Sequence, residues 1–479
     1  MKYFLGFFFV IYKKYTMKIE RNRQLAKDIV TYVIGNTGSK FLAFLLIPIL
    51  TFFLGREELG YYDISLEAIL FLLPVITLQM RESTFRLLIN TNDESYRKHI
   101  LSSTFFIEFI IFAIVLVIAS FLPFFFSIRY FRLIVLSVYA YSLYEIYIQA
   151  VRSVYSSAHF VYISLIASFL TLALTLLFYL FFKRGIEALF IANIISRISA
   201  MLIIEIPRRK VLYNISLRYF TRKYVREIFH YSMPMLGTAV AFAIITSPGK
   251  FVVNYFLGTD ANGILAPAHK FMSILIMLGT SFSQAWQVTA VKNYREHDNV
   301  KFFSEVFNKY TIALCLLVLC ISFGLRSFKT ILIGSEFYQS VNLIYIYCVS
   351  AVFYCLALFL EIIYQCTKQT AKILYSIVTC AVISFPLTIL LTKSFGLTGT
   401  ITALTVAYVY LFIFRYFQTK STLPIRLNRD FWLSFIVLAV GGVIFYCTNN
   451  RIVDYTVLFM VSGLLIYYLL TMKKYVSKN

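Results

Sequence analysis

The chain repeats one feature along almost its whole length: stretches of about 20 apolar residues that carry few or no charges. Each is long enough to cross the ~30 Å hydrocarbon core of a bilayer. Backbone N–H and C=O groups in lipid must be satisfied within the protein, so such stretches form helices. A membrane barrel would instead show alternating segments of about ten residues, which this sequence lacks. The pattern predicts an all-α polytopic membrane protein.

The apolar stretches predict about fourteen transmembrane helices. They fall at residues 29–54, 60–80, 101–122, 131–151, 160–182, 186–206, 229–257, 262–290, 310–326, 341–365, 372–392, 396–417, 430–447 and 453–472. Residues 1–16 precede them and are interpreted as an over-extended N-terminus, because the segment from Met17 is a more natural start. The connections are too short for a soluble catalytic domain, so the function is expected inside the membrane.

The charge of the loops predicts an orientation. The formal net charge is +23, which in a soluble protein would suggest nucleic acid. Here the basic residues alternate from loop to loop, and only nine fall on one side: Arg56, Arg129, Arg132, Lys183, Arg184, Arg326, Lys329, Lys393 and Arg451. Cytoplasmic loops are the basic ones. Both termini are therefore expected in the cytoplasm, and no nucleic-acid partner is expected.

The two halves of the chain repeat each other. Phe53-Leu54-Gly55, followed by Gly60, returns as Phe256-Leu257-Gly258, followed by Gly263. Glu145, Gln149 and Arg152 return with the same spacing as Glu361, Gln365 and Lys368. Each repeat holds six predicted helices, so both enter the membrane from the same side. The repeat predicts an N-lobe at 17–215, a C-lobe at 216–420, and two further helices with a tail at 421–479.

Seven charged residues lie deep in the predicted spans, where each costs on the order of 2.5–3.5 kcal/mol at the bilayer centre. They are the cations Lys40, Arg197, Lys250 and Lys270 and the acids Glu67, Glu145 and Glu361. Such residues persist when they face a wet cavity or one another. One interpretation is a polar lumen between the halves, with cations that meet an anionic substrate. Pro248-Gly249 is expected to break or bend the helix there, as at many transport sites.

Structural alternatives stay open for several of these charges. Glu145, Gln149 and Arg152 share one helix face and are equally well read as an ion-pair stripe. Glu67 and Lys270 are equally compatible with a structural pair between the halves. Lys250 lies near enough to the helix end to reach the interface.

Motifs for enzymatic chemistry are absent from the sequence. It has no phosphate-binding GxxxxGK[ST] loop, no HExxH and no GxSxG. Its seven cysteines lie in apolar stretches or at their edges and indicate neither a disulfide framework nor a metal site. The chain is therefore expected to be a transporter rather than an enzyme, without cofactor. It would be driven by H+, Na+ or the substrate gradient, and Glu67, Glu145 or Glu361 would carry a coupling proton.

Two segments carry a family resemblance. They are the hairpin from Pro48 through Phe53-Leu54-Gly55 to Tyr61, and the stretch from Tyr231-Ser-Met-Pro234 through Lys250 and Lys270 to Ala285-Trp286. Together they resemble the polysaccharide-exporter, or O-antigen flippase-like, family of the multidrug/oligosaccharidyl-lipid/polysaccharide exporter superfamily. Arg86 stands where that family often has an arginine. One departure is Gly249, which precedes Lys250 where members often place an acid.

The resemblance implies a MATE-like fold of two six-helix lobes around a cleft that works by alternating access. It implies a flippase that moves an undecaprenyl-pyrophosphate-linked oligosaccharide to the outer leaflet of a bacterial inner membrane, for surface polysaccharide biosynthesis. Lys40, Arg86, Arg197, Lys250 and Lys270 would bind the anionic substrate. The expected partners are the bilayer, that glycolipid and other polysaccharide-assembly proteins, and the chain is expected to be a monomer.

Two other functions remain as alternatives. An ion-coupled multidrug exporter of the same fold would favour an acidic cleft, whereas the deep charges here lean towards cations. A membrane polysaccharide polymerase would need a large outer loop, and an acyltransferase would need a catalytic histidine or arginine face. Short loops and the internal repeat argue against both enzymes.

Overall fold

The computed structural model describes residues 38, 41–42, 44–89, 91, 93–125, 128–155, 157–182, 185–294, 299–367, 369–448 and 450–478. These residues form helices and short connections, with no strand among them. They separate into two compact units. One unit contains Leu50–Gly60 and Pro248–Asn479, and the other contains Tyr61–Ser247 with the described part of Val30–Ile49. Lys40 lies outside the described residues. The lobe boundaries predicted from the repeat stay a prediction.

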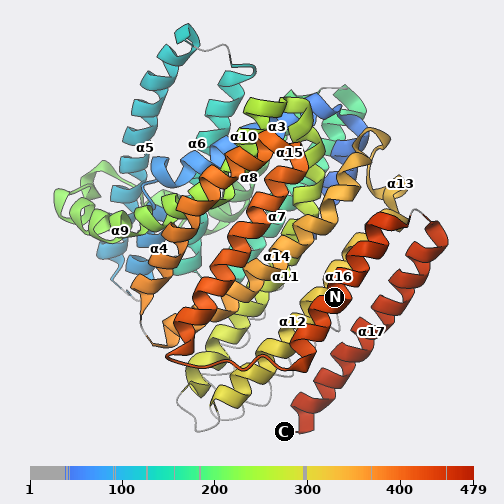
Figure 1. Cartoon of the computed structure of the whole chain (residues 1–479). Helices are drawn as coiled ribbons and strands as arrows, with labels where there is room; N and C mark the ends of the chain where they lie inside the picture. Colours follow the sequence, from blue (N-terminus) through green and yellow to red (C-terminus); the bar gives the residue numbers. More distant parts are fainter. Residues whose placement is uncertain are drawn as a thin grey trace. The chain divides into compact units, whose positions relative to one another are not determined.

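Figure 1 shows the helices in sequence colours. After a short apolar helix, Phe44–Phe53, they are α3 (Arg56–Ile76), α4 (Met80–Leu88), α5 (Glu94–Phe125), α6 (Phe131–Val154), α7 (Ser157–Phe182), α8 (Ile186–Arg208), η1 (Leu212–Asn214), η2 (Leu217–Tyr219), α9 (Arg222–Thr246), α10 (Pro248–Leu257), α11 (Thr259–Asn293), α12 (Asn299–Ser327), α13 (Lys329–Leu332), η3 (Ser335–Phe337), α14 (Gln339–Cys366), α15 (Thr370–Lys420), α16 (Arg429–Cys447) and α17 (Arg451–Lys478).

Eleven helices in the described ranges are long and apolar enough to cross a membrane. Their outward faces are rich in exposed apolar side chains, such as Phe109 and Val117 on α5 and Phe459 on α17. Exposure of so large a contiguous apolar surface is unfavourable in water but not in lipid. The structure confirms the predicted all-α polytopic membrane fold. The number fourteen stays a prediction, because part of the first predicted span lies outside the described residues.

Two helices extend well beyond their predicted spans. The sequence predicts spans at 101–122 and 310–326, and the structure shows α5 at Glu94–Phe125 and α12 at Asn299–Ser327. The added turns carry polar residues, including Lys301 and Glu305. Hydropathy detects only the part of a helix that lies in hydrocarbon. It does not detect polar helical turns that continue beyond the hydrocarbon.

The chain reverses direction within α15. Gly396 has φ +61°, a left-handed conformation that glycine adopts without a side-chain clash. The Thr392 and Thr400 hydroxyls lie 2.8 Å apart, although eight residues of straight helix would separate them by about 12 Å. A Cβ on Gly399 would overlap the carbonyl oxygen of Leu391. α15 is therefore a hairpin of two helices, in agreement with the predicted spans at 372–392 and 396–417.

The predicted break at Pro248 is confirmed. α9 ends at Thr246 and α10 begins at Pro248. Proline has no N–H to continue the helix, but it fits the first turn of a new one, where that N–H would be unpaired. The break also coincides with the boundary between the two compact units at Ser247 and Pro248. A single predicted span is thus divided between them.

The repeated glycines make a reciprocal contact within the unit that contains Leu50–Gly60 and Pro248–Asn479. A Cβ on Gly60 would overlap the carbonyl oxygen of Thr259, and a Cβ on Gly263 would overlap that of Arg56. Each glycine therefore packs against the hairpin of the other repeat. Equivalent residues that exchange equivalent contacts are what a pseudo-two-fold relation between repeats requires.

We expect Gly60→Ala and Gly263→Ala each to lower the thermal stability of the purified protein. Overpacking of this kind typically costs about 1–3 kcal/mol, and backbone oxygens cannot move aside as a flexible side chain would. Gly55→Ala is the matched control on the same hairpin, because no atom lies within 4 Å of a Cβ built there. Melting temperatures equal to those of the control would rule out the close contact.

The aromatic core of the same unit lies between α11, α12 and α14. The rings of Phe282 and Tyr310 stack at 4.0 Å, and Trp286 stacks on Phe359 at 5.0 Å. The C-terminal helix α17 is fastened to this core through an ion pair, because Arg326 of α12 binds the Asp454 carboxylate with its Nε at 2.8 Å. The loop charges predict Arg326 in an outer loop. The structure shows it buried at the end of α12.

Candidate functional site

Arg197 lies inside the helix bundle of the unit that contains Tyr61–Ser247. Its Nη1 donates to the carbonyl oxygen of Asn193 at 3.0 Å and to the side-chain Oδ1 of Asn193 at 2.7 Å. The guanidinium stacks on the ring of Tyr141 at 3.4 Å and lies 5.8 Å from that of Tyr144. Arginine stacks well on aromatic faces because its charge is delocalised over a plane. The side chain is thereby fixed in one orientation.

Asn193 connects this arginine to a larger polar and aromatic cluster. Its Nδ2 donates to the Tyr62 hydroxyl at 2.6 Å, and its Oδ1 accepts from the Tyr141 hydroxyl at 3.3 Å. Tyr62 packs edge-on against Phe190. Hydrogen bonds connected in this way rigidify the residues that make them. We call Arg197, Asn193, Tyr62, Tyr141 and Tyr144 the arginine cluster.

The charge of Arg197 has no counter-charge among the described residues. Its hydrogen-bond acceptors are both on Asn193, and no described carboxylate forms an ion pair with it. Its Nε is buried without a hydrogen-bond partner in the described part of the chain. An unpaired buried donor costs about 1–3 kcal/mol. Such a group is suited to an anionic oxygen, which would supply both the missing acceptor and the missing charge.

Lys250 and Lys270 belong to the other unit. Lys250 is in the first turn of α10 and is only 6% exposed, and its carbonyl oxygen accepts from Nδ2 of Asn262 at 3.0 Å. Lys270 is half-buried on α11, where its carbonyl accepts from the Ser273 hydroxyl at 2.6 Å. Their predicted depth in the bilayer stays a prediction. A cavity common to Lys40, Arg197, Lys250 and Lys270 stays a prediction.

Arg86 lies on the short helix α4 and is exposed. α4 begins after a turn in which Leu78 and Gln79 both have positive φ. Sequence analysis placed Arg86 simply after the second helix. The structure places it on a separate helix.

The acids Glu145 and Glu361 are both paired with arginines. Glu145 accepts from Nη1 of Arg81 at 2.9 Å, and Glu361 accepts from Nη1 of Arg415 at 2.8 Å. An arginine that pairs with Glu145 therefore comes from another helix, α4. Arg152 lies over the ring of Phe85 at 4.4 Å. The ion-pair stripe predicted along the face of Glu145, Gln149 and Arg152 stays a prediction.

Glu67 accepts a hydrogen bond from the Ser247 hydroxyl at 2.7 Å. Ser247 is the residue at which the helix breaks between α9 and α10. Glu67 therefore contacts the break directly. Lys270, the alternative partner predicted for Glu67, belongs to the other compact unit, so that pair stays a prediction.

The structure reveals buried charges that the predicted site does not contain, among them Glu108 and Arg415. Glu108 lies within the predicted span 101–122 and is 0% exposed, so its position alone was a sufficient signal. Arg415 lies near the end of the span 396–417, where a cation is normally taken as an interfacial residue. It is instead only 1% exposed. Its contacts come from α14 and from the first half of α15, which no local pattern specifies.

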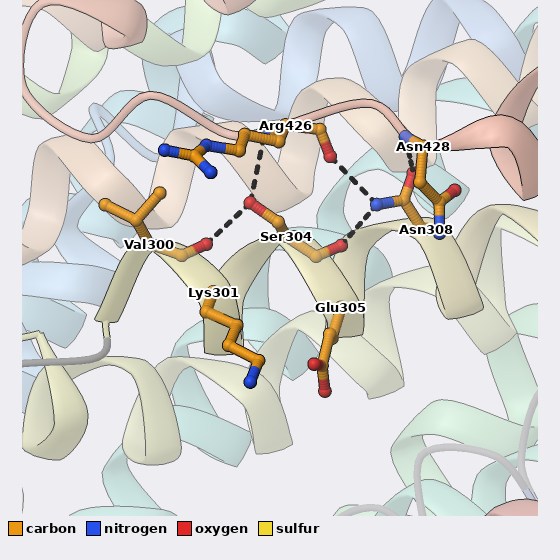
Figure 2. Close-up of a pocket in the computed structure, with 7 residues that line it drawn as sticks. All are labelled: Val300, Lys301, Ser304, Glu305, Asn308, Arg426 and Asn428. Atoms are coloured by element: carbon orange, nitrogen blue, oxygen red, sulfur yellow. Dashed lines mark hydrogen bonds between the residues drawn. The ribbon is translucent and has the colours of Figure 1, made fainter.

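A polar pocket of about 320 Å³ lies between α12 and the segment before α16 (Figure 2). Asn308 donates to the Arg426 carbonyl at 2.9 Å and accepts from the backbone N–H of Asn428 at 3.2 Å. Lys301 and Glu305 extend from α12 in the same direction. The pocket carries both signs of charge, and its amides bond the protein itself. These hydrogen bonds attach the segment before α16 to α12, so we do not assign an anion-binding site to this pocket.

The chain matches a family model described as "Polysaccharide biosynthesis protein" over residues 25–287. None of the curated proteins matches it in sequence.

Solved structures show the same fold at low sequence identity. A structure of the lipid II flippase MurJ in an inward closed conformation is 18% identical, with a TM-score of 0.70 over 91% of this chain and 98% of that one. An inward-facing multidrug resistance MATE family transporter of the MOP superfamily is 13% identical, with a TM-score of 0.64 over 85% and 95%. A MOP superfamily transporter from Pyrococcus furiosus is 13% identical, with a TM-score of 0.56 over 87% and 96%.

These comparisons confirm the fold and the family resemblance drawn from the sequence. The structural neighbours are flippases and transporters, and the family model covers more than half of the chain. The protein is therefore a multi-pass membrane protein with the MATE and MurJ fold, and it belongs to the polysaccharide biosynthesis protein family.

Proposed function

We propose that this chain is a flippase for an undecaprenyl-pyrophosphate-linked oligosaccharide in a bacterial inner membrane. It moves the glycolipid from the cytoplasmic to the outer leaflet by alternating access, in surface polysaccharide biosynthesis of the O-antigen type. Its termini lie in the cytoplasm, it works as a monomer, and an ion gradient drives it. The family match and the shared fold support the transport of a lipid-linked substrate.

The arginine cluster is the observation that carries the proposal. A guanidinium presents a planar fork of N–H donors that matches the oxygens of a diphosphate. Arg197 is held in one orientation by Tyr141 and Asn193 without neutralisation by an acid. Tyr141 and Asn193 are neutral, so Arg197 can bind an anion without first breaking an ion pair. Electrostatic attraction is also stronger in a low-dielectric bundle than in water.

The remaining predicted cations extend this proposal. Lys40, Arg86, Lys250 and Lys270 contact the diphosphate or the sugars at different stages of transport. Lys250 is well placed for such a change because α10 begins at the helix break. Broken helices near transport sites give a mobile joint and free backbone groups that a substrate can use.

The lipid tail of the carrier has a matching apolar groove. A cavity of about 190 Å³ lies between α12 and α16, lined mainly by Ile312, Leu316, Leu433 and Val437. We propose that this groove guides part of the tail while the head group crosses.

Transport in proteoliposomes tests the proposal. The substrate is a fluorescent polyprenyl-diphosphate oligosaccharide whose sugar is quenched or cleaved only from outside the vesicle. We expect the protein to raise the exchange of this lipid between leaflets at least tenfold over empty vesicles. A parallel assay follows export of a cationic dye. Movement of the dye without movement of the glycolipid would make the chain a multidrug exporter and would contradict the proposal.

A further inference from the structure

Glu108 is an acid in the middle of the apolar helix α5, and it is completely buried. Its exposed fraction is 0%. Neither carboxyl oxygen has a hydrogen-bond partner among the described residues. The carboxyl lies about 21 Å along α5 from its first residue, at a rise of about 1.5 Å per residue. Nothing in the predicted site or in the ion pairs described above uses this group.

The surroundings of Glu108 come chiefly from α6. Tyr139 and Ser142 lie next to the carboxyl. The hydroxyl of Ser142 donates to the Tyr139 carbonyl oxygen at 3.0 Å, and its oxygen lies beside the acid. The ring of Tyr139 stacks on Phe112, one turn further along α5, at 3.8 Å. Tyr139 is thus the titratable group that faces Glu108 from α6.

Among the described elements, α4, α9, η1 and η2 also pack on α5. Their contacts with α5 that involve polar groups lie nearer its beginning. Thr84 of α4 bonds Thr104, and Ser216 bonds Ser102. The charged and titratable groups of these elements contact α5 still nearer its first residue. Glu227 accepts a hydrogen bond from Tyr96, and the rings of Tyr219 and Tyr224 contact His99. His99 is about two and a half turns from Glu108. Of the cations on α4, Arg81 pairs with Glu145 and Arg86 is exposed.

Glu108 differs from four other acids inside the described ranges. Glu145 and Glu361 each pair with an arginine. The carboxylate of Asp454 binds Arg326, and that of Glu205 accepts from the Tyr147 hydroxyl at 3.0 Å. Those acids have partners that stabilise the ionised form. Glu108 has no such hydrogen-bond partner in the part of the chain that the structure describes. Its ionised form is therefore unfavourable, since a buried charge without a partner is strongly disfavoured.

We propose that Glu108 is a proton-binding site that couples transport to the proton gradient. This inference rests on the proposed function as a flippase. In the conformation described here the carboxyl is the neutral acid and lies sealed between α5 and α6. In the alternate conformation of the cycle it opens to water, its O–H bond breaks, and the proton passes to a water molecule. Reprotonation from the opposite side then favours the sealed state.

The chemistry of the site favours a proton over a metal cation. Hard metal ions in proteins take several oxygen ligands, about six or more for calcium. The described residues contain no group of three acidic, histidine or cysteine side chains that could hold a metal. A single carboxyl with no neighbouring acid is sufficient for a proton. The sequence is compatible with H+ or Na+, and the acids that it suggests for coupling, Glu67, Glu145 and Glu361, are all hydrogen-bonded in the structure.

Two measurements on Glu108→Gln test the proposal. In proteoliposomes, an imposed pH gradient is expected to speed glycolipid exchange at least fivefold in the natural protein and to have no effect in Glu108→Gln. Glu108→Asp retains an acid and is expected to keep part of the response. Glu94→Gln is the matched control, because Glu94 is exposed at the start of the same helix. It is expected to respond like the natural protein.

The second measurement does not depend on glycolipid transport. Infrared spectroscopy of the membrane-embedded protein detects the C=O stretch of a protonated, buried carboxyl. We expect one such signal to be lost in Glu108→Gln and retained in Glu94→Gln. If the natural protein failed to move the glycolipid but this signal behaved as expected, the proposed function would be refuted. The proton site would still be supported. An unchanged signal, or an undiminished gradient response in Glu108→Gln, would overturn the proton site itself.

Discussion

Replacing Arg197 by glutamate is expected to abolish glycolipid transport while the protein continues to accumulate in the membrane. The substitution places a negative charge where the diphosphate is proposed to bind. It also removes the guanidinium from the ring of Tyr141 and from Asn193. Charge-assisted hydrogen bonds of this kind contribute roughly 1.5–3 kcal/mol each, so even the neutral change Arg197→Gln should slow transport at least tenfold. Flipping rates in proteoliposomes measure both effects.

A matched control separates substrate binding from general loss of charge. Arg132 is an exposed cation on α6, the helix that carries Tyr141. Arg132→Gln is expected to transport at close to the natural rate. Lys40→Glu is expected to behave like Arg197→Glu. Full transport by both glutamate variants would be incompatible with a cationic binding site.

Replacing Arg415 by leucine is expected to destabilise the unit that contains Pro248–Asn479. The guanidinium bonds three groups: the Ser376 hydroxyl at 3.0 Å, the Ala357 carbonyl at 2.9 Å and the Glu361 carboxylate at 2.8 Å. Removing one partner of a buried pair typically costs 3–5 kcal/mol. We expect about 3 kcal/mol here, because the Glu361 side chain is 21% exposed and keeps some solvation. Thermal unfolding in detergent measures the loss.

A double variant distinguishes a structural role of this pair from a role in coupling. Arg415→Leu combined with Glu361→Leu also removes the Glu361 charge that the single variant leaves unpaired. Apolar replacement of both partners of a buried ion pair often leaves folding stability unchanged or raises it. We expect the double variant to recover much of the lost stability and to retain a response to the pH gradient. If stability returned but the gradient response disappeared, Glu361 would be a coupling residue rather than a structural one.

Much of the fold could be predicted from the sequence because the bilayer leaves few choices. Apolar length alone placed most helices, and Pro248 placed the break between α9 and α10. The spacing of Gly60 and Gly263 predicted a repeat, and the reciprocal contact between them follows from it. The polar ends of α5 and α12 were missed because hydropathy reports hydrocarbon and not helicity.

The partners of the charged residues could be predicted far less well. Local spacing placed Glu145 and Arg152 on one helix face, but it gave no sign of Arg81 on α4, which pairs with Glu145 in the structure. Which face of one helix meets which face of another depends on packing over the whole unit, and one sequence does not specify it. Arg197 was predicted to lie inside the bundle, yet the tyrosines that hold it come from other helices.

Binding of a polyprenyl diphosphate to the purified protein tests the central claim most directly. Native mass spectrometry or a thermal-shift titration gives its dissociation constant for the natural protein and for Arg197→Gln. The account predicts saturable binding that weakens at least tenfold in the variant, and a polyprenyl alcohol of the same length that binds equally weakly to both. Equal affinity of the two proteins for the diphosphate would contradict the role assigned to Arg197.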